Sequence, residues 1–262
     1  MITTETFTKE LTDEVEKLFH MGAHLGHKKN RLHPRARKYV YKIVNGGSII
    51  DLTMTVSLLT EAKRMLAEYG KEGKVVLVVV TKKVANQFTM EYCGTNSVPY
   101  IASKWLPGLL TNFETIIKNV KKLKTLKEQR ENGEWDKFVK HERMKLDKEV
   151  TKLDKLYGGI VELIKRPDVI LCVDTKKEKN AVEESRMNKI PVVAIVDTNS
   201  NPDEVLPIVM NDDSPELVQY VLKQLIDSYI KGRDTKVEEK PQEKTKEEPK
   251  VEKKKTTKAK KS

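Results

Sequence analysis

The sequence predicts an α/β protein, with a body built on a parallel sheet and an inserted antiparallel helical hairpin. Two patterns predict this class. The strand Val169 to Val173, the helix Lys177 to Met187 and the strand Val192 to Val196 form a βαβ unit, which implies parallel pairing and a right-handed crossover. In addition, a long segment between the two halves of the sheet repeats apolar residues at three-four spacing, which is typical of paired helices.

The first part of the predicted body, residues 1 to 103, holds an N-terminal helix, a basic region and the first strands. Tyr39 to Asp51 carries Asn45-Gly46-Gly47 between two apolar runs, which predicts a β-hairpin at the sheet margin. Leu58 to Tyr69 has helical spacing, and Lys74 to Val80 is a β-branched run typical of a strand buried on both faces. Its apolar part is far too short to span a bilayer, so we expect no membrane partner.

The predicted hairpin insertion covers residues 104 to 159. Apolar residues recur at helical spacing from Phe113 to Leu123, stop at Asn132-Gly133, and resume from Val139 to Tyr157. Gly158-Gly159 then predicts the C-terminal stop of the second helix. The apolar seam is narrow, so this coiled-coil-like hairpin should expose most of its charged circumference.

The second part of the body, residues 160 to 232, ends in a predicted amphipathic helix whose apolar positions run from Leu217 to Tyr229. Beyond it, residues 233 to 262 contain 12 Lys or Arg and 7 Asp or Glu, with Val237 and Val251 the only aliphatic residues larger than Ala. Such a segment buries too little apolar surface to offset its ordering entropy. We therefore expect a disordered basic tail.

Positive charge is concentrated in two regions of this chain. The whole chain has 50 basic and 39 acidic residues, a net charge of +11. Gly22 to Ile50 contains no acid and contributes +7, while Lys104 to Tyr157 contributes +5. Because ordinary surfaces intersperse both signs, this segregation predicts contact with the phosphates of a nucleic acid, through shape more than base sequence.

The predicted RNA contacts lie in both basic regions and at the entry to the hairpin. Trp105 is a large aromatic residue at that entry, and it is either a packing anchor or a platform for a stacked base. The full set of expected contacts is Lys28, Lys29, Arg31, Arg35, Arg37, Lys38, Lys42, Lys104, Trp105, Asn112, Lys118, Lys121 and Lys122.

His24 and His27 form an H-x-x-H pattern flanked by Gly22 and Gly26. With Asp residues brought in from elsewhere in the chain, this pair is compatible with a zinc or magnesium site. Two histidines without a fixed third ligand equally suit hydrogen-bonded structural roles or RNA contacts. We therefore assign no cofactor and keep a metal site as an alternative.

Catalysis is the main competing function class. Asp174, Asp197 and Asp203 follow predicted parallel strands, where α/β enzymes place their sites. However, the sequence contains no Walker A loop, no GxGxxG and no nucleophile elbow. Asp174 suits a helix N-cap and Asp197 a turn. We therefore expect that the protein is not an enzyme and that it has no small-molecule substrate.

Several stretches together resemble the bacterial small-subunit ribosomal protein S2 family, in order and over nearly the whole predicted ordered chain. The matching stretches are Gly22 to His27, Ile49 to Leu52, Trp105-Leu106 with Gly108, Leu110 to Asn112, Leu153 to Ile160, Pro167-Asp168, Ile190 to Asn199 with Pro202, and Asn211 to Asp213. Lys104 stands where the family usually has Arg, and Pro107 where it usually has Gly. Lys104 keeps the charge but lacks the fork that binds phosphate bidentately.

The resemblance implies a flavodoxin-like body and a seat between the head and body of the small subunit. It also implies contacts with small-subunit ribosomal RNA and neighbouring ribosomal proteins, support of subunit assembly, and docking of ribosomal protein S1 for messenger RNA binding. The two cysteines, Cys93 and Cys172, lack metal or redox spacing, and the first residues resemble no signal or transit peptide. We expect a bacterial, cytoplasmic protein; a free RNA chaperone is the remaining alternative.

Overall fold

The computed structural model describes residues 4–239, and within this range the strands form two sheets. The larger sheet is parallel, in the order β5-β4-β6-β7-β8, with bounds β4 (Val76–Val79), β5 (Tyr100–Ile101), β6 (Val169–Val173), β7 (Val192–Val196) and β8 (Leu206–Val209). The smaller sheet is antiparallel, in the order β1-β3-β2, with bounds β1 (Leu25–Lys28), β2 (Val40–Val44) and β3 (Gly47–Ile50). The predicted α/β class with a parallel sheet is confirmed.

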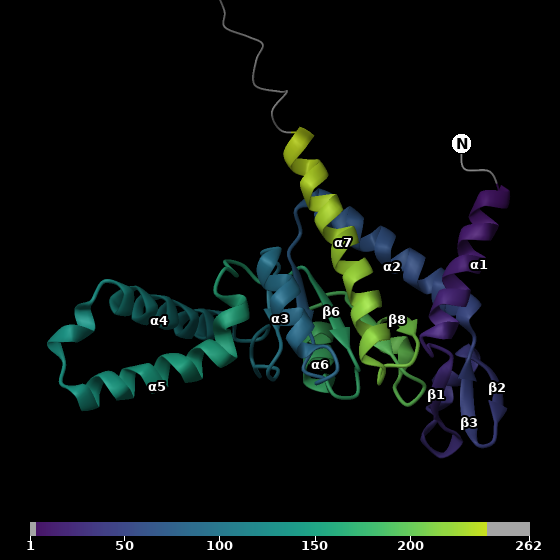
Figure 1. Cartoon of the computed structure of the whole chain (residues 1–262), viewed down its shortest axis with the longest axis horizontal. Helices are drawn as coiled ribbons and strands as arrows, with labels where there is room; N and C mark the ends of the chain where they lie inside the picture. Colours follow the sequence, from purple (N-terminus) through teal and green to yellow (C-terminus); the bar gives the residue numbers. More distant parts are fainter. Residues whose placement is uncertain (1–3, 240–262) are drawn as a thin grey trace, which may run out of the picture.

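Helices cover both faces of the larger sheet (Figure 1). Alternate residues of one strand point to opposite faces: Val78 packs with α2 (Leu52–Glu72) and α7 (Pro215–Glu239), and Leu77 packs with α6 (Lys179–Met187) and the base of the hairpin. Strands β4, β6 and β7 are buried at every position. Covering on both faces explains why these strands read as unbroken apolar runs.

Helices α2 and α7 touch through their backbones at two glycines. A Cβ added to Gly232 would lie 2.0 Å from the carbonyl oxygen of Ala67, and one added to Gly70 would lie 2.3 Å from the carbonyl oxygen of Tyr229. Both neighbours are backbone atoms that cannot rotate away. Glycine is therefore required at this crossing by the closeness of the two helices.

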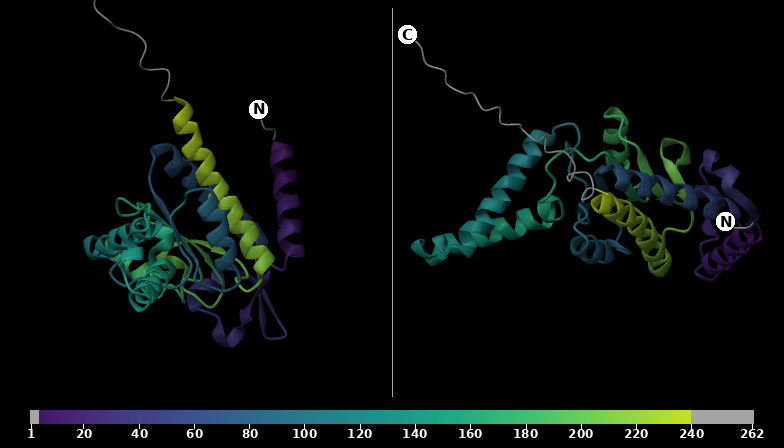
Figure 2. Two further views of the ribbon diagram at one scale, coloured as in Figure 1. Left: turned by 60° about the vertical axis from the view of Figure 1, so that its left-hand side comes forward. Right: turned by 90° about the horizontal axis from the view of Figure 1, so that it is seen from above.

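The predicted hairpin is formed by α4 (Phe113–Glu131) and α5 (Lys140–Tyr157), which project from the body (Figures 1 and 2). Val120 and Leu123 of α4 and Val150 of α5 are buried along the shared seam. At the base, Gly159 lies so close to edge strand β5 that an added Cβ would be 2.3 Å from the carbonyl oxygen of Tyr100. The predicted double-glycine stop therefore also seats the hairpin on the sheet.

Other predictions are refined by the structure. The predicted hairpin within Tyr39 to Asp51 forms as β2 and β3, with positive φ at Asn45 (49°) and Gly46 (77°). Helix α6 begins at Lys179, two residues later than predicted, after a turn capped by Asp174. Helices α1 (Thr4–His20) and α3 (Asn86–Thr95) complete the described helices.

The boundary of the predicted disordered tail is wrong at its start. Residues 233–239 continue α7, and Arg233 Nη1 donates a hydrogen bond to the carbonyl oxygen of Asn96 at 3.1 Å. Extending an existing helix adds one hydrogen bond per residue, so it does not need local apolar residues. The rest of the predicted tail, residues 240–262, lies outside the described residues. None of the helices in the described range is long and apolar enough to cross a membrane.

Candidate nucleic-acid interface

The predicted cations of the first basic region lie on one exposed segment, residues 28–42, which we call the basic loop. The loop leaves β1, passes through short 3-10 turns at Lys29–Arg31 and Pro34–Tyr39, and enters β2. Ala36 and Tyr39 are buried, and the amide of His33 donates to the carbonyl oxygen of Thr198 at 2.8 Å. The backbone is thus fastened to the body while all seven predicted cations are exposed: Lys28, Lys29, Arg31, Arg35, Arg37, Lys38 and Lys42.

Two of these cations share an acid from the body. Arg35 Nη1 lies 3.3 Å from Asp203 Oδ2, and Lys38 Nζ lies 2.8 Å from Asp203 Oδ1. The hydrogen bond from Lys38 holds the pKa of Asp203 below its usual value. Among the described residues, the other five cations of the basic loop have no acidic partner within ion-pair distance. Those five are free to neutralise an external anion.

The predicted hairpin contacts differ in their availability. Lys104, Lys118 and Lys121 are exposed and make no ion pair within the described chain. Lys122 is also exposed, but its Nζ is paired across the hairpin with Glu149 of α5. An external phosphate would therefore have to compete for Lys122.

Trp105 and Asn112 flank the turn that enters the hairpin. Trp105 is only 7% exposed, and its Nε1 donates to Glu184 Oε1 at 2.9 Å. Of the two roles expected for Trp105, the structure therefore fits the packing anchor, because a stacked base needs an open ring face. Asn112 is exposed, and its Oδ1 accepts a hydrogen bond from the Thr115 hydroxyl at 2.8 Å in the first turn of α4.

The two cationic regions lie at opposite ends of the molecule. The hairpin α4–α5 extends from one end of the long axis, and the three-stranded sheet that carries the basic loop lies at the other end (Figure 1). The view from above shows the same separation (Figure 2). The structure therefore offers two separate footprints for a polyanion, with the body between them.

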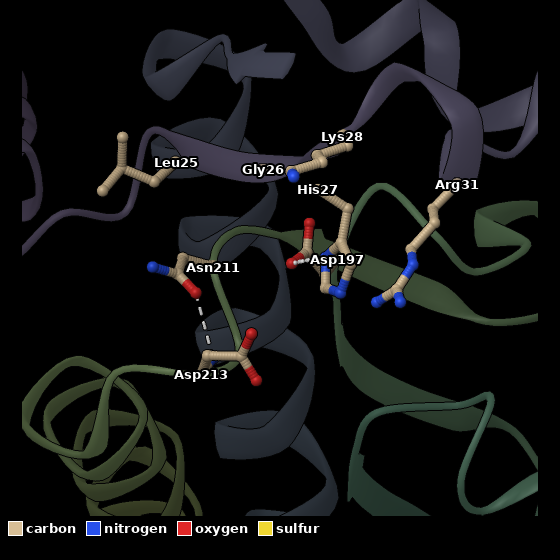
Figure 3. Close-up of a pocket in the computed structure, with 8 residues that line it drawn as sticks. All are labelled: Leu25, Gly26, His27, Lys28, Arg31, Asp197, Asn211 and Asp213. Carbon is tan, nitrogen blue, oxygen red and sulfur yellow. Dashed lines mark hydrogen bonds and ion pairs between the residues drawn. The ribbon is translucent and has the colours of Figure 1, made fainter. Parts of the chain in front are cut away.

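A pocket of about 540 Å³ opens beside the basic loop (Figure 3). Strand β1 forms one side of it, and the loops that follow β7 and β8 form the other sides. Strand β1 lies directly against the loop after β7, since a Cβ added to Gly26 would be 2.8 Å from the Thr198 side chain. The lining residues are Leu25, Gly26, His27, Lys28, Arg31, Asp197, Asn211 and Asp213.

His27 is held inside this pocket by two side chains of the β7 loop. Its Nδ1 lies 2.6 Å from Oδ2 of the buried Asp197, and its Nε2 lies 3.1 Å from Nδ2 of the Asn199 side-chain amide. With the amide donating to Nε2, Nδ1 carries the proton and donates to Asp197. The second oxygen of Asp197 accepts from the Thr198 hydroxyl at 3.0 Å, which fixes the carboxylate.

The pocket contains one group of metal-ligand type. One ligand atom each from His27, Asp197 and Asp213 lies within 4.8 Å of the other two. A hydrogen bond from Lys82 at 2.7 Å holds the pKa of Asp213 below its usual value, so this carboxyl is ionised. One imidazole and two carboxylates suit zinc better than magnesium, which prefers oxygen ligands alone.

The two histidines of the H-x-x-H pattern are not used together. His24 lies outside the group of ligand atoms, and its ring stacks on Phe19 with centroids 4.3 Å apart. His24 lies in the turn that precedes β1, whereas His27 lies within the strand. The backbone therefore does not direct the two side chains to one site.

The crevice where flavodoxin-like enzymes bind ligands is occupied here by side chains of the protein. Strand order reverses between β4 and β6, which places that crevice at their carboxyl ends. There, Lys177 Nζ donates to the carbonyl oxygen of Thr81 at 2.9 Å, and the Thr81 hydroxyl donates to the buried Glu178. Asp174, which the enzyme alternative required, caps its own turn through the amides of residues 176 and 177.

These features define an α/β protein that presents cations on two separate elements. The family model described as "Ribosomal protein S2" matches residues 18–232, the greater part of the chain. The chain belongs to the ribosomal protein S2 family, and it is a structural, non-enzymatic component of the small ribosomal subunit in the bacterial cytoplasm.

Curated relatives match this chain over most of their length. The protein from Dehalococcoides mccartyi strain 195, named small ribosomal subunit protein uS2, is 38% identical over 224 residues, which is 85% of this chain and 91% of the relative. The uS2 of Helicobacter hepaticus is 35% identical over 86% of both chains. That of Coprothermobacter proteolyticus is 37% identical over 84% of this chain and 82% of the relative.

Proposed function

We propose that this chain binds small-subunit ribosomal RNA at the junction of the head and body, and so supports subunit assembly and the docking of ribosomal protein S1. The observation that carries RNA binding is the basic loop, whose seven cations are exposed and five of which have no acidic partner among the described residues. The placement on the subunit and the docking of S1 are supported by the family resemblance.

The mechanism is electrostatic positioning of a rigid body. Each cation that meets a phosphate releases condensed counterions, so affinity falls steeply as salt rises. The buried Ala36 and Tyr39 hold the loop backbone, which lowers the entropy lost when the cations are ordered on RNA. Phosphate contacts of this kind set register and orientation without reading bases.

Matched double variants test the role of the basic loop. Lys29→Gln with Arg37→Gln removes two unpaired cations, and Arg35→Gln with Lys38→Gln removes the two that share Asp203. Binding to protein-free small-subunit ribosomal RNA is measured over a range of salt concentrations. The first pair should lower the slope of log K against log salt by about 1.4–1.8, and the second pair by less. Equal slopes for wild type and the first pair would remove the loop from the contact surface.

Sedimentation of a cell lysate tests the wider proposal. A subunit component migrates in stoichiometric amounts with small subunits, whereas a free RNA chaperone stays at the top of the gradient. Subunits that carry the Lys29→Gln and Arg37→Gln variant are then probed for ribosomal protein S1. Normal S1 content in subunits that lack this chain would refute the docking role.

A further inference from the structure

The outer face of α5 carries a row of four lysines, Lys145, Lys148, Lys152 and Lys155, which we call the lysine row. Their spacing of three, four and three residues keeps all four on one side of the helix, within an arc of about 80°, and over a length of about 15 Å. All four are exposed, and none makes an ion pair with another described residue.

The acids of α5 are used elsewhere, which leaves the lysine row uncompensated. Three of them pair across the seam with cations of α4, in the pairs Glu149 with Lys122, Asp154 with Lys127 and Asp147 with Arg130. Glu142, in the first turn, is the remaining acid of this helix. The hairpin thus neutralises its inner flanks and leaves cations on its outer face.

The repulsion between the four lysines of the row destabilises the isolated hairpin. Like charges three or four residues apart on a helix are destabilising by about 0.2–0.5 kcal/mol per pair, and the lysine row contains three such steps. A bound polyanion turns this repulsion into attraction. In the free protein the lysine row therefore lowers stability, and a bound anion relieves that repulsion.

The chemistry of the lysine row fits an RNA backbone better than a protein. Stable protein interfaces have an apolar core, but Val150 is buried in the seam with α4, and Leu146 and Leu153 also pack there. Phosphate contact needs only exposed cations. We propose that the lysine row is a further RNA-phosphate contact surface on the outer face of α5, separate from the basic loop and from the predicted contacts on α4; this inference rests on the proposed RNA-binding function.

The test compares two full-length double variants that lose equal charge. Lys148→Gln with Lys152→Gln removes the centre of the lysine row, and glutamine preserves helix propensity. The control, Lys165→Gln with Lys179→Gln, removes two exposed lysines outside the hairpin that are paired with Asp168 and Glu183. Binding to protein-free small-subunit ribosomal RNA is measured against salt, and circular dichroism checks that both variants keep their helix content.

The lysine-row variant should lower the slope of log K against log salt by about 1.4–1.8, which is 0.7–0.9 for each lost phosphate contact, while the control stays near wild type. A wild-type slope in the lysine-row variant overturns the inference and leaves the proposed function standing. An unchanged RNA slope with weaker binding to small subunits stripped of this protein would assign the surface to an acidic protein and also overturn it. Failure of wild-type protein to bind the RNA would refute the proposed function itself.

Discussion

Glu184 of α6 anchors the turn that leads into the hairpin, and its removal gives a sharp test of how the hairpin is attached. Its Oε1 accepts hydrogen bonds from Trp105 Nε1 at 2.9 Å and from the amide of Gly108 at 2.8 Å, and its Oε2 accepts from the amide of Leu110 at 3.1 Å. Trp105 and Leu110 are buried. One carboxylate therefore satisfies three donors that have little access to water.

The expected loss for Glu184→Ala follows from these three bonds. A hydrogen bond to a charged group contributes about 1.5–3 kcal/mol, so complete loss of all three would cost at least about 4.5 kcal/mol. Water can reach the partly buried site and recover some of this, which gives an expected loss of about 3–5 kcal/mol in the free energy of unfolding. For a chain of this size, that loss lowers the melting temperature by roughly 10 °C.

Urea denaturation followed by circular dichroism measures this loss, with two variants as controls. Glu184→Gln keeps one acceptor oxygen and should lose about 1–2 kcal/mol. Glu183→Ala removes the neighbouring carboxylate, which makes only a partly exposed ion pair with Lys179 at 3.5 Å, and should change stability by less than about 0.5 kcal/mol. If Glu184→Ala costs no more than Glu183→Ala, the three hydrogen bonds do not hold the turn.

Three further outcomes are expected. Gly232→Ala should destabilise the protein by more than about 2 kcal/mol because its Cβ meets backbone of the facing helix, whereas Gly94→Ala, with open space around the added Cβ, should raise the melting temperature slightly. Burial raises the pKa of Glu178, so the folded state binds this proton more tightly and loses stability as pH rises from about 4.5 through the raised pKa; Glu178→Gln should match wild type at pH 4 in urea denaturation and exceed it at pH 7. Zinc added to chelator-treated protein should raise the melting temperature of wild type and His24→Ala but not of His27→Ala, and a shift that persists in the last variant would exclude the pocket as the site.

Local sequence patterns were sufficient for the main elements of this fold. The run Val169 to Val173 reads as a strand because helices cover both of its faces, so every position must be apolar. The seam of the hairpin repeats at helical spacing because only one side of each helix is buried. The basic loop was also predictable, because a run of cations without acids can be seen in the sequence of the segment itself.

Short edge elements were not predictable in the same way. Strand β5 contains only Tyr100–Ile101, and β1 is Leu25–Lys28, a Gly- and His-containing segment without alternation. The two residues of β5 are too few to show a period of two, and the four residues of β1 do not alternate between apolar and polar. Both form because a neighbouring strand, β4 or β3, offers free backbone groups, which is a property of the assembled sheet.

The sequence by itself determined the α/β class, the helical hairpin and the two cationic regions, because each depends on periodicity or composition within a short stretch. Only the tertiary structure decided which cations are free. The loop after β7 brings Asp203 to Lys38 across 165 positions of sequence and Asp197 to His27 across 170, and α6 brings Glu184 to Trp105 across 79. Such pairs depend on the order of the strands in the parallel sheet, and no local sequence pattern predicts that order.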